Sequence, residues 1–332
     1  MADVAIEPKN MAVSLTKIAA VKRSGAHDVF FRTITFSAAA LVVILFAGMM
    51  VALTDGAWLS IKTFGLDFIT SKKWNQVTEE FGALTAVYGT LVTSFMAMVL
   101  AVPIGIGIAI FLTEICPRAL RRPIGIAIEL LAGIPSIVYG IWGLFTFAPF
   151  FQEYVQPWIV DAVANIPVLQ TILAGPPYGI GVATAAFILS IMILPFISSV
   201  TRDVFNTVPS TLKESAYAMG CTTWEVIWHV VLPFSRAGVV GGAMLALGRA
   251  LGETMAITFV IGNAHRIPTS LFAPGTSISA TIANEFTEAV GDIYKSSLIE
   301  VGLILFFISF VVLASAQIML RILHKRAGGV TG

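Results

Sequence analysis

Six long stretches of this sequence contain few or no charged residues, and they constrain the fold more than any other feature. They lie at residues 33–54, 81–113, 130–152, about 178–200, about 234–262 and 301–320. A helix needs about 20 apolar residues to cross a hydrocarbon core about 30 Å thick, and each stretch is long enough. Because the backbone must satisfy its own polar groups inside lipid, we expect an all-α integral membrane protein with six transmembrane helices.

Composition and charge placement indicate the class of protein and its orientation. Only 12% of the residues are charged and the mean hydropathy is +0.89, whereas soluble domains carry about 25% charged residues. If the N-terminus is cytoplasmic, 14 of the 20 lysines and arginines fall in inside segments and five in outside loops. The positive-inside rule therefore predicts that both termini are cytoplasmic. The first apolar run is too long and too late for a cleaved signal peptide, which makes it an anchor.

The sequence divides into one membrane domain and two short tails. The tails are residues 1–28 and 327–332, and the domain between them, 29–326, has no internal repeat. On the outside, residues 54–80 hold four aromatic side chains among mixed charges, which favours a short interfacial helix or a docking ridge. On the inside, the loop at 201–233 is much longer than a connecting turn requires.

Two charged residues stand inside the fifth expected helix, in the string LGRALGETMA (247–256). An unpaired charge at the bilayer centre costs at least about 3 kcal/mol, so such residues face a protein interior or a water-filled path. Arg249 and Glu253 are four residues apart, which places them on one helix face within reach of each other. We expect Arg249 to line an anion path, with Glu253 as its resting counter-ion. The alternative is an intrahelical salt bridge that only fixes helix packing.

The loop at 201–233 is patterned as two short helices with a hinge between them. Pro209 and Ser210 suit the start of the first helix, and Gly220 suits its end, because glycine readily adopts a left-handed cap. Thr222 or Thr223 can cap the second helix. Three apolar residues fall on one face of the first helix, at spacings of three and four: Leu212, Ala216 and Met219. The pattern by itself favours an amphipathic helix on the membrane surface.

The same loop resembles the EAA loop of ABC importer permeases, which reads Glu-Ala-Ala, three residues, Gly, nine residues, Ile-x-Leu-Pro. The matching residues are Glu214, Ser215, Ala216, Gly220, Val230, Leu232 and Pro233, with Ser215 and Val230 as the two replacements. In that family the loop is a coupling helix that docks on the ATPase subunit. The resemblance therefore implies a type I importer (MetI-like) permease fold with a cytoplasmic coupling helix. It also implies coupling roles for Glu214, Ser215, Ala216, Gly220, Leu232 and Pro233.

The sequence contains no motif for ATP hydrolysis or for the common hydrolytic enzymes. The phosphate loop G-x-x-x-x-G-K-[ST] is missing, as is any Gly-Lys pair. The strings H-E-x-x-H and G-x-S-x-G are missing as well. We therefore expect a permease and not an enzyme, with no cofactor in this chain. ATP and Mg²⁺ are expected on a separate ATPase subunit.

Three further strings resemble the PstC-like permeases of the bacterial phosphate ABC importer (Pst system): FGALTAVYGTLVTS (81–94), LLAGIPSIVYGIWGL (130–144) and LGRALGETMAITFVIGN (247–263). The resemblance covers most of residues 30–325. It implies a permease for inorganic phosphate in the bacterial inner membrane. The implied partners are a homologous A-type permease, a dimer of ATPase subunits, a periplasmic phosphate-binding protein and the lipid bilayer, with no nucleic acid among them.

The chemistry of the expected path fits a tetrahedral oxyanion. The planar guanidinium of Arg249 can bind such an anion bidentately, and Glu253 can hold it when no anion is present. In the third helix, Pro135 removes a backbone donor and frees the carbonyl of Leu131. That carbonyl and Ser136 are candidates to line the same path. An ordinary packing kink at Pro135 explains the pattern equally well.

Two other functions fit parts of the sequence. A permease for sulfate, molybdate or phosphonate is one, because sulfate and molybdate permeases carry runs similar to Arg-Ala-Leu-Gly-Glu. An ion-coupled secondary carrier with Glu129 and Glu253 as proton sites is the other, and ATP dependence of uptake distinguishes it. For Glu129 we favour a solvated or capping role. His265 and Arg266 follow helix five, where they could guide an anion inward, but simple solvation is the favoured role of His265.

Overall fold

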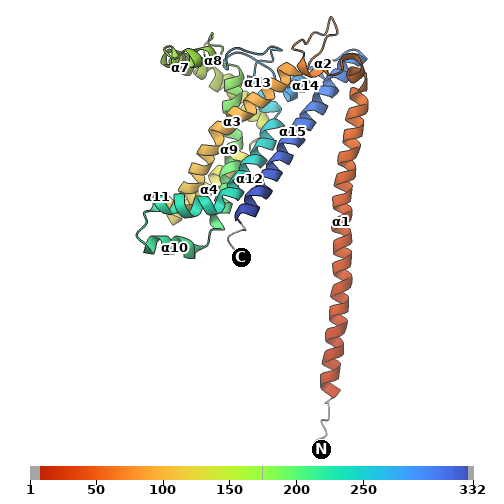
Figure 1. Cartoon of the computed structure of the whole chain (residues 1–332), viewed down its shortest axis with the longest axis vertical. Helices are drawn as coiled ribbons and strands as arrows, with labels where there is room; N and C mark the ends of the chain where they lie inside the picture. Colours follow the sequence, from red (N-terminus) through yellow and green to blue (C-terminus); the bar gives the residue numbers. More distant parts are fainter. Residues whose placement is uncertain (1–7, 174, 328–332) are drawn as a thin grey trace, which may run out of the picture. The chain divides into compact units, whose positions relative to one another are not determined.

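The computed structural model describes residues 8–173 and 175–327, and the regular structure of these residues is helical apart from one β-bridge between Asn75 and Glu80. The expectation of an all-α protein is confirmed for this part of the chain. The chain forms two compact units, residues 1–55 and residues 56–332. Figure 1 labels the helices along the chain.

The described part of the first unit is a single helix, α1 (Pro8–Phe64), whose last residues belong to the second unit. The stretch His27–Phe64 is long and apolar enough to cross a membrane, and an 18-residue window within it has a mean hydropathy of 2.5. Apolar side chains between residues 29 and 51 are exposed, as expected for a helix that faces lipid. The helix extends beyond the expected 33–54 because it ends only at Gly65, whose φ of +56° suits a left-handed cap.

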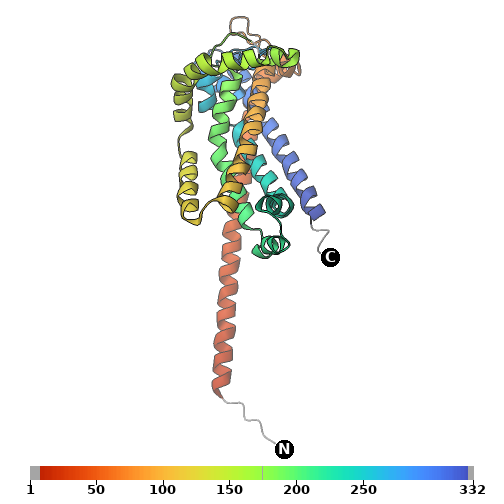
Figure 2. The same cartoon turned by 90° about the vertical axis from the view of Figure 1, so that its left-hand side faces the viewer.

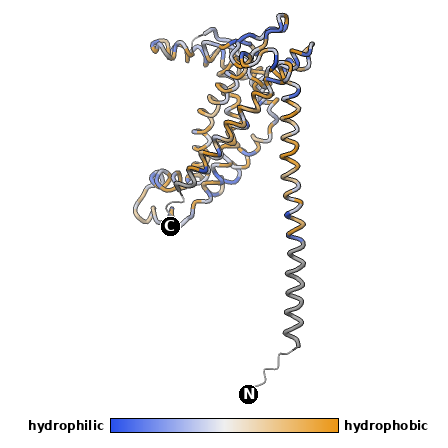
Figure 3. The backbone as a smooth tube through the Cα atoms, turned by 45° about the vertical axis from the view of Figure 1, so that its right-hand side comes forward, coloured by the Kyte–Doolittle hydropathy of each residue, from blue (hydrophilic) through white to orange (hydrophobic). Residues whose placement is uncertain are grey.

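Four helices build the core of the second unit: α3 (Leu84–Ile110), α9 (Val182–Asn206), α12 (Leu232–Leu251) and α15 (Asp292–Ala327). Figure 3 shows these helices mainly hydrophobic along their lengths and more hydrophilic toward the ends of the unit. Small side chains let α3 approach α9 closely, which is how membrane helices pack without a hydrophobic driving force. Ala97 and Ala101 are fully buried, and a Cβ added at Gly105 would press on Ile197 of α9.

The third expected span is bent, which corrects the expectation of one helix over 130–152. The chain runs through α4 (Arg118–Ala132), then α5 (Ser136–Trp142), η2 (Gly143–Phe147), α6 (Ala148–Phe150), η3 (Phe151–Val155) and α7 (Gln156–Val163). The two parts meet at 86° (Figure 2, yellow to yellow-green). Pro135 causes the break, because it has no N–H to donate and disfavours helix at Ile134. Five described helices are therefore long and apolar enough to cross a membrane, or six if the bent pair counts as one span.

The second unit has two distinct ends (Figure 1). One end carries α2 (Asp67–Thr70), α7, α8 (Pro167–Leu173), α13 (Met255–Val260) and α14 (Ile278–Glu285), and we call it the α14 end. The other carries α10 (Ser210–Ala218) and α11 (Thr223–Val226), and we call it the α10 end. The short α2 lies within residues 54–80, where an interfacial helix or a docking ridge is expected, and both roles stay predictions.

Candidate functional site

The fifth expected span is interrupted beside its two charged residues. α12 ends at Leu251, the chain turns at Gly252, and α13 begins at Met255, so the expected single helix over 234–262 is wrong. The side chain of Glu253 is buried, and its Oε1 accepts a hydrogen bond from the backbone N–H of Ala256 at 3.3 Å. The carboxylate thus satisfies one of the free donors in the first turn of α13.

The expected contact between Arg249 and Glu253 does not form. Arg249 lies in the last turn of α12 with an exposed side chain, and no ion pair joins it to Glu253 in the described part of the chain. A four-residue spacing brings two side chains together only on a continuous helix, and the turn at Gly252 interrupts this one. The structure therefore contradicts the shared helix face assumed for the resting counter-ion. The path roles of Arg249 and Glu253 stay predictions.

One tyrosine forms a hydrogen bond across the break in the third span. The carbonyl oxygen of Leu131, which Pro135 deprives of its helical donor, accepts a hydrogen bond from the hydroxyl of Tyr139 at 2.8 Å. Pro135 precedes α5, and Ser136 is its half-buried first residue. The carbonyl thus lacks the donor that residue 135 would supply, as expected from the sequence. It accepts instead from the Tyr139 hydroxyl and, at 3.3 Å, from the backbone N–H of Ile134.

The two broken spans pack against each other. α5 lies on α13, and a Cβ added at Gly140 would press on the backbone of Met255 and Ala256, at 3.1 and 3.2 Å. α14 joins them, because the hydroxyl of Ser279 donates to the carbonyl oxygen of Glu253 at 2.7 Å. The structure thus makes neighbours of α5 and α13, the segments that follow the two breaks.

The loop at 201–233 has the expected form of two helices with a glycine hinge. α10 begins at Ser210, and Gly220 follows it with φ +89°, in the left-handed region that favours glycine. Thr222 and Glu225 form a capping box at the start of α11, with the N–H of Thr222 donating to Glu225 Oε2 at 2.7 Å. The second helix then continues without a break to Leu251.

Leu232 and Pro233, the end of the EAA-like pattern, lie in the first turn of α12 and not in a hinge. A π-helical turn over Ile227–Val231 (η4) comes directly before them. A proline removes a backbone donor from a helix, and π turns absorb such irregularities. α11, η4 and α12 therefore form one continuous helix, which leads from the loop into the fifth span.

Only one residue of the apolar face expected on α10 is buried, and the other two are exposed. Ala216 is buried, whereas Leu212 and Met219 are 44% and 79% exposed. Ala216 lies at the edge of the stripe because it follows Leu212 by slightly more than one turn of 3.6 residues. Glu214 and Ser215 are also exposed. We call Leu212, Glu214, Ser215 and Met219 the α10 surface; it presents apolar groups that the described residues of the chain leave uncovered.

A partly buried carboxylate, Glu285, joins several segments at the α14 end by hydrogen bonds. Glu285 accepts hydrogen bonds from Trp74 Nε1 at 2.7 Å and from the Tyr294 hydroxyl at 2.6 Å, and its Oε1 lies 2.7 Å from His265 Nε2. Burial opposes ionisation of Glu285, but the bonds from His265, Tyr294 and Trp74 outweigh it and hold its pKa below the ordinary value. The carboxylate therefore keeps these bonds to lower pH than an ordinary glutamate would.

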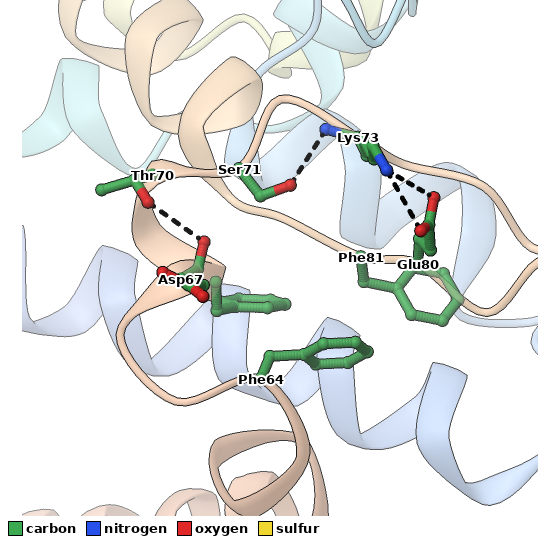
Figure 4. Close-up of a pocket in the computed structure, with 8 residues that line it drawn as sticks. Phe64, Asp67, Thr70, Ser71, Lys73, Glu80 and Phe81 are labelled. Carbon is green, nitrogen blue, oxygen red and sulfur yellow. Dashed lines mark hydrogen bonds and ion pairs between the residues drawn. The ribbon is translucent and has the colours of Figure 1, made fainter.

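Simple solvation of His265 is thus wrong: its side chain is only 18% exposed and stacks on Trp74 at 5.2 Å between ring centroids. The sequence carried no signal for this cluster, because its members come from segments up to 220 residues apart. A pocket of about 370 Å³ opens nearby in the 54–80 segment (Figure 4). The residues that line it include three phenylalanines and three charged side chains: Phe64, Phe68, Phe81, Asp67, Lys73 and Glu80.

Glu129 has a partner that sequence analysis did not anticipate. Its Oε1 lies 2.7 Å from a guanidinium nitrogen of Arg202, so the residue ties α4 to α9 and is not simply solvated or capping. The approach is close, because a Cβ added at Gly125 would come within 3.0 Å of the Arg202 side chain. A glycine at 125 therefore makes room for the ion pair. This contact holds the first half of the bent span against the core.

Comparison with known proteins agrees with this architecture and with the EAA-like loop. Residues 101–329 match the family described as binding-protein-dependent transport system inner membrane component. A solved alginate-importing bacterial ABC transporter has a chain that is 17% identical, with a TM-score of 0.58, covering 91% of this chain and 98% of that one. A chain of the MetNI methionine ABC transporter is 17% identical with a TM-score of 0.50, covering 75% and 96%. These structures support the type I, MetI-like permease fold.

The chain is more closely similar to named permeases. It is 62% identical to the phosphate transport system permease protein PstC of Mesorhizobium japonicum, over 98% of this chain and 99% of that protein. It is 54% identical to the protein of the same name from Pasteurella multocida, over 91% and 94%. The chain therefore belongs to the inner membrane components of binding-protein-dependent transport systems, among the PstC-like permeases, and is a multi-pass membrane protein.

Proposed function

We propose that this chain is one permease subunit of an ATP-driven importer and that it forms part of the path for inorganic phosphate. The substrate is delivered by a periplasmic binding protein, and ATP is hydrolysed by a separate pair of ATPase subunits. A homologous A-type permease completes the membrane part, and both termini of this chain lie in the cytoplasm. The observation that carries the proposal is the 62% identity to a PstC protein over nearly the whole length of both chains.

Two features of the structure support the proposal. The α10 surface leaves Leu212 and Met219 exposed beside the membrane domain, which suits docking of an ATPase subunit. The segments that follow the two helix breaks, α5 and α13, pack against each other, and interrupted helices recur at substrate sites of membrane transporters, where they expose backbone groups. Arg249, one turn before the second break, supplies the charge and the planar fork that an oxyanion requires.

The test is purification of the complex through a tag on this chain, identification of its partners, and reconstitution in proteoliposomes. Uptake of labelled phosphate should require ATP and the binding protein and should persist when ionophores dissipate the ion gradients. Sulfate, molybdate and phosphonate in excess should compete weakly. Strong competition by one of them would reassign the substrate, and uptake without ATP would replace the importer with an ion-coupled carrier.

The orientation is tested by labelling intact cells with an impermeant thiol reagent. Cys116 and Cys221 are first replaced by serine, and cysteine is then introduced at Val290 or Ser215. Val290 is 87% exposed at the α14 end and should react, whereas Ser215 on the α10 surface should react only after the cells are opened. Labelling of Ser215→Cys in intact cells would reverse the proposed orientation.

The hinge of the coupling loop is tested by Gly220→Val. A Cβ at Gly220 meets no atom within 4 Å, so space is not limiting, but φ +89° is strained for a β-branched residue by about 1–2 kcal/mol. We expect assembly to persist while ATP hydrolysis loses its dependence on the loaded binding protein. Gly220→Asn is the matched control, because asparagine tolerates left-handed conformations and should stay largely coupled. Normal coupling in the valine variant would remove the hinge from the mechanism.

A further inference from the structure

The coupling-loop helix α10 is attached to the rest of the second unit on two sides. Ala216 is 4% exposed and belongs to an apolar cluster that includes Ala109 of α3 and Phe205 of α9. Lys213 lies three residues earlier and therefore on the same side of the helix. Its Nζ donates to Glu114 Oε1 at 2.6 Å. One apolar contact and one ion pair thus join α10 to the helices beneath it.

The ion pair is well protected from solvent. The side chain of Glu114 is 8% exposed and that of Lys213 is 20% exposed. Removal of one partner from a buried pair leaves an uncompensated charge, so the contact holds only while both partners are present. Solvent screens a pair at this depth much less than an exposed one. The pair is therefore a stiffer link than an ion pair on an open surface.

Glu114 lies where three helices come together. It belongs to the π-helical turn Phe111–Ile115 (η1), which continues α3. In the same turn, the carbonyl oxygen of Thr113 accepts a hydrogen bond from the guanidinium of Arg121 in α4 at 2.6 Å. A force on Lys213 is therefore applied to the end of α3, directly beside the start of the bent span.

The other end of α3 is linked through α14 to the helix break that holds Glu253. Thr90 Oγ1 accepts a hydrogen bond from the backbone N–H of Ile278, at the start of α14, at 2.9 Å. The next residue, Ser279, donates to the carbonyl oxygen of Glu253 at 2.7 Å. α3 has 27 residues, so at 1.5 Å per residue it spans about 40 Å. A continuous series of contacts therefore runs from α10 through α3 and α14 to the break at residues 252–254.

We propose that the Glu114–Lys213 ion pair makes α3 follow α10, so that a displacement of α10 by the ATPase subunit reaches the helix break beside Arg249. The inference rests on the proposed function, in which α10 docks on that subunit. Lys213 faces α3 while the α10 surface stays free for the partner, so one short helix serves both contacts. Without the pair, α10 is held mainly by the small side chain of Ala216 and can slide on α3 without moving it. Glu114 and Lys213 are positioning residues, since neither needs to touch the transported anion.

The experiment measures phosphate taken up per ATP hydrolysed, using the complete complex in proteoliposomes. Lys213→Met and Glu114→Gln should each lower this ratio about tenfold while ATP hydrolysis continues, as expected for a lost coupling contact. The charge-exchanged variant, Lys213→Glu with Glu114→Lys, should recover most of the ratio. Lys295→Met is the control, because Lys295 is an exposed lysine of α15 and its loss should leave the ratio unchanged.

Each other outcome has a defined meaning. An unchanged ratio in both single variants, even with less assembled complex, would overturn the proposal and leave a packing contact. If the single variants do not assemble, Glu114→Cys with Lys213→Cys is joined by a short bifunctional thiol reagent, in a chain whose Cys116 and Cys221 are serine. A normal ratio after bridging supports the proposal, and a loss caused by bridging overturns it. If the complex with the original chain takes up no phosphate, the proposed function has failed before any variant is compared.

Discussion

Arg249→Gln is expected to lower phosphate uptake by about 10- to 100-fold, because a charged hydrogen-bonding group contributes about 1.5–3 kcal/mol. Assembly should be unaffected, since Arg249 is exposed in this chain and has no ion pair with Glu253 whose loss would disturb packing. Arg249→Lys should recover only part of the uptake, because a point charge does not reproduce bidentate contact with an oxyanion. Uptake in proteoliposomes is measured beside the amount of assembled complex.

The control for this substitution is Arg236→Gln, which removes an exposed arginine nearer the start of the same helix. It should leave uptake close to that of the original complex. The double variant Arg249→Gln with Glu253→Gln should stay as impaired as Arg249→Gln alone. Glutamine keeps an oxygen that can accept from the N–H of Ala256, so the cap of α13 should survive. Recovery of uptake in the double variant, or full uptake by Arg249→Gln, would remove Arg249 from the path.

Gly89→Ala is expected to destabilise the complex more than any other single methyl group added to α3. A Cβ at Gly89 would overlap the carbonyl oxygen of Thr276, and a backbone atom cannot rotate away as a side chain can. The contact between α3 and the start of α14 would open, including the bond between Thr90 and Ile278. We expect a cost of about 3 kcal/mol, at the upper end for overpacking. The measurements are the thermal midpoint of the purified complex and its yield.

α3 supplies its own control for this prediction. A Cβ at Gly107 would meet no atom within 4 Å, so Gly107→Ala adds the same methyl group without a clash. Alanine also favours a helix over glycine by about 1 kcal/mol, so this variant should be as stable as the original or slightly more so. Equal thermal midpoints for Gly89→Ala and Gly107→Ala would contradict the prediction, because they would show that the α3–α14 contact accommodates the added methyl group at little cost.

Features that depend on local chemistry were predictable from the sequence. The hinge at Gly220 follows from the need for a left-handed residue after a helix. The sequence predicts a cap at Thr222 or Thr223, and the structure has it at Thr222, as part of a capping box with Glu225. Pro135 predicted a freed carbonyl at Leu131, and that carbonyl does take a side-chain donor. The hinge and the cap involve residues within three positions of one another, so local backbone geometry is enough to form them. The bond from Tyr139 to Leu131 also depends on the bend at residues 133–135.

Contacts between distant segments were not predictable in this way. Glu114 and Lys213 are 99 residues apart and Trp74 and Glu285 are 211 apart, so their pairing depends on how the helices pack. The prediction of one continuous helix for the fifth span was wrong for a related reason. Its sequence, from LGRALGETMA onward, is apolar enough for one continuous helix, and α14 and α5 pack at the place where it breaks.

The sequence by itself determined that the chain is a helical membrane protein with an EAA-like loop, because hydrophobic length, glycine and proline positions and motif spacing act over short distances. Only the tertiary structure decided that Glu253 caps α13 in place of pairing with Arg249, and that Lys213 reaches α3. The physical reason is that a buried polar group takes whichever partner the packed helices place within about 3 Å of it. That choice is made by the arrangement of the whole bundle and not by the residues on either side.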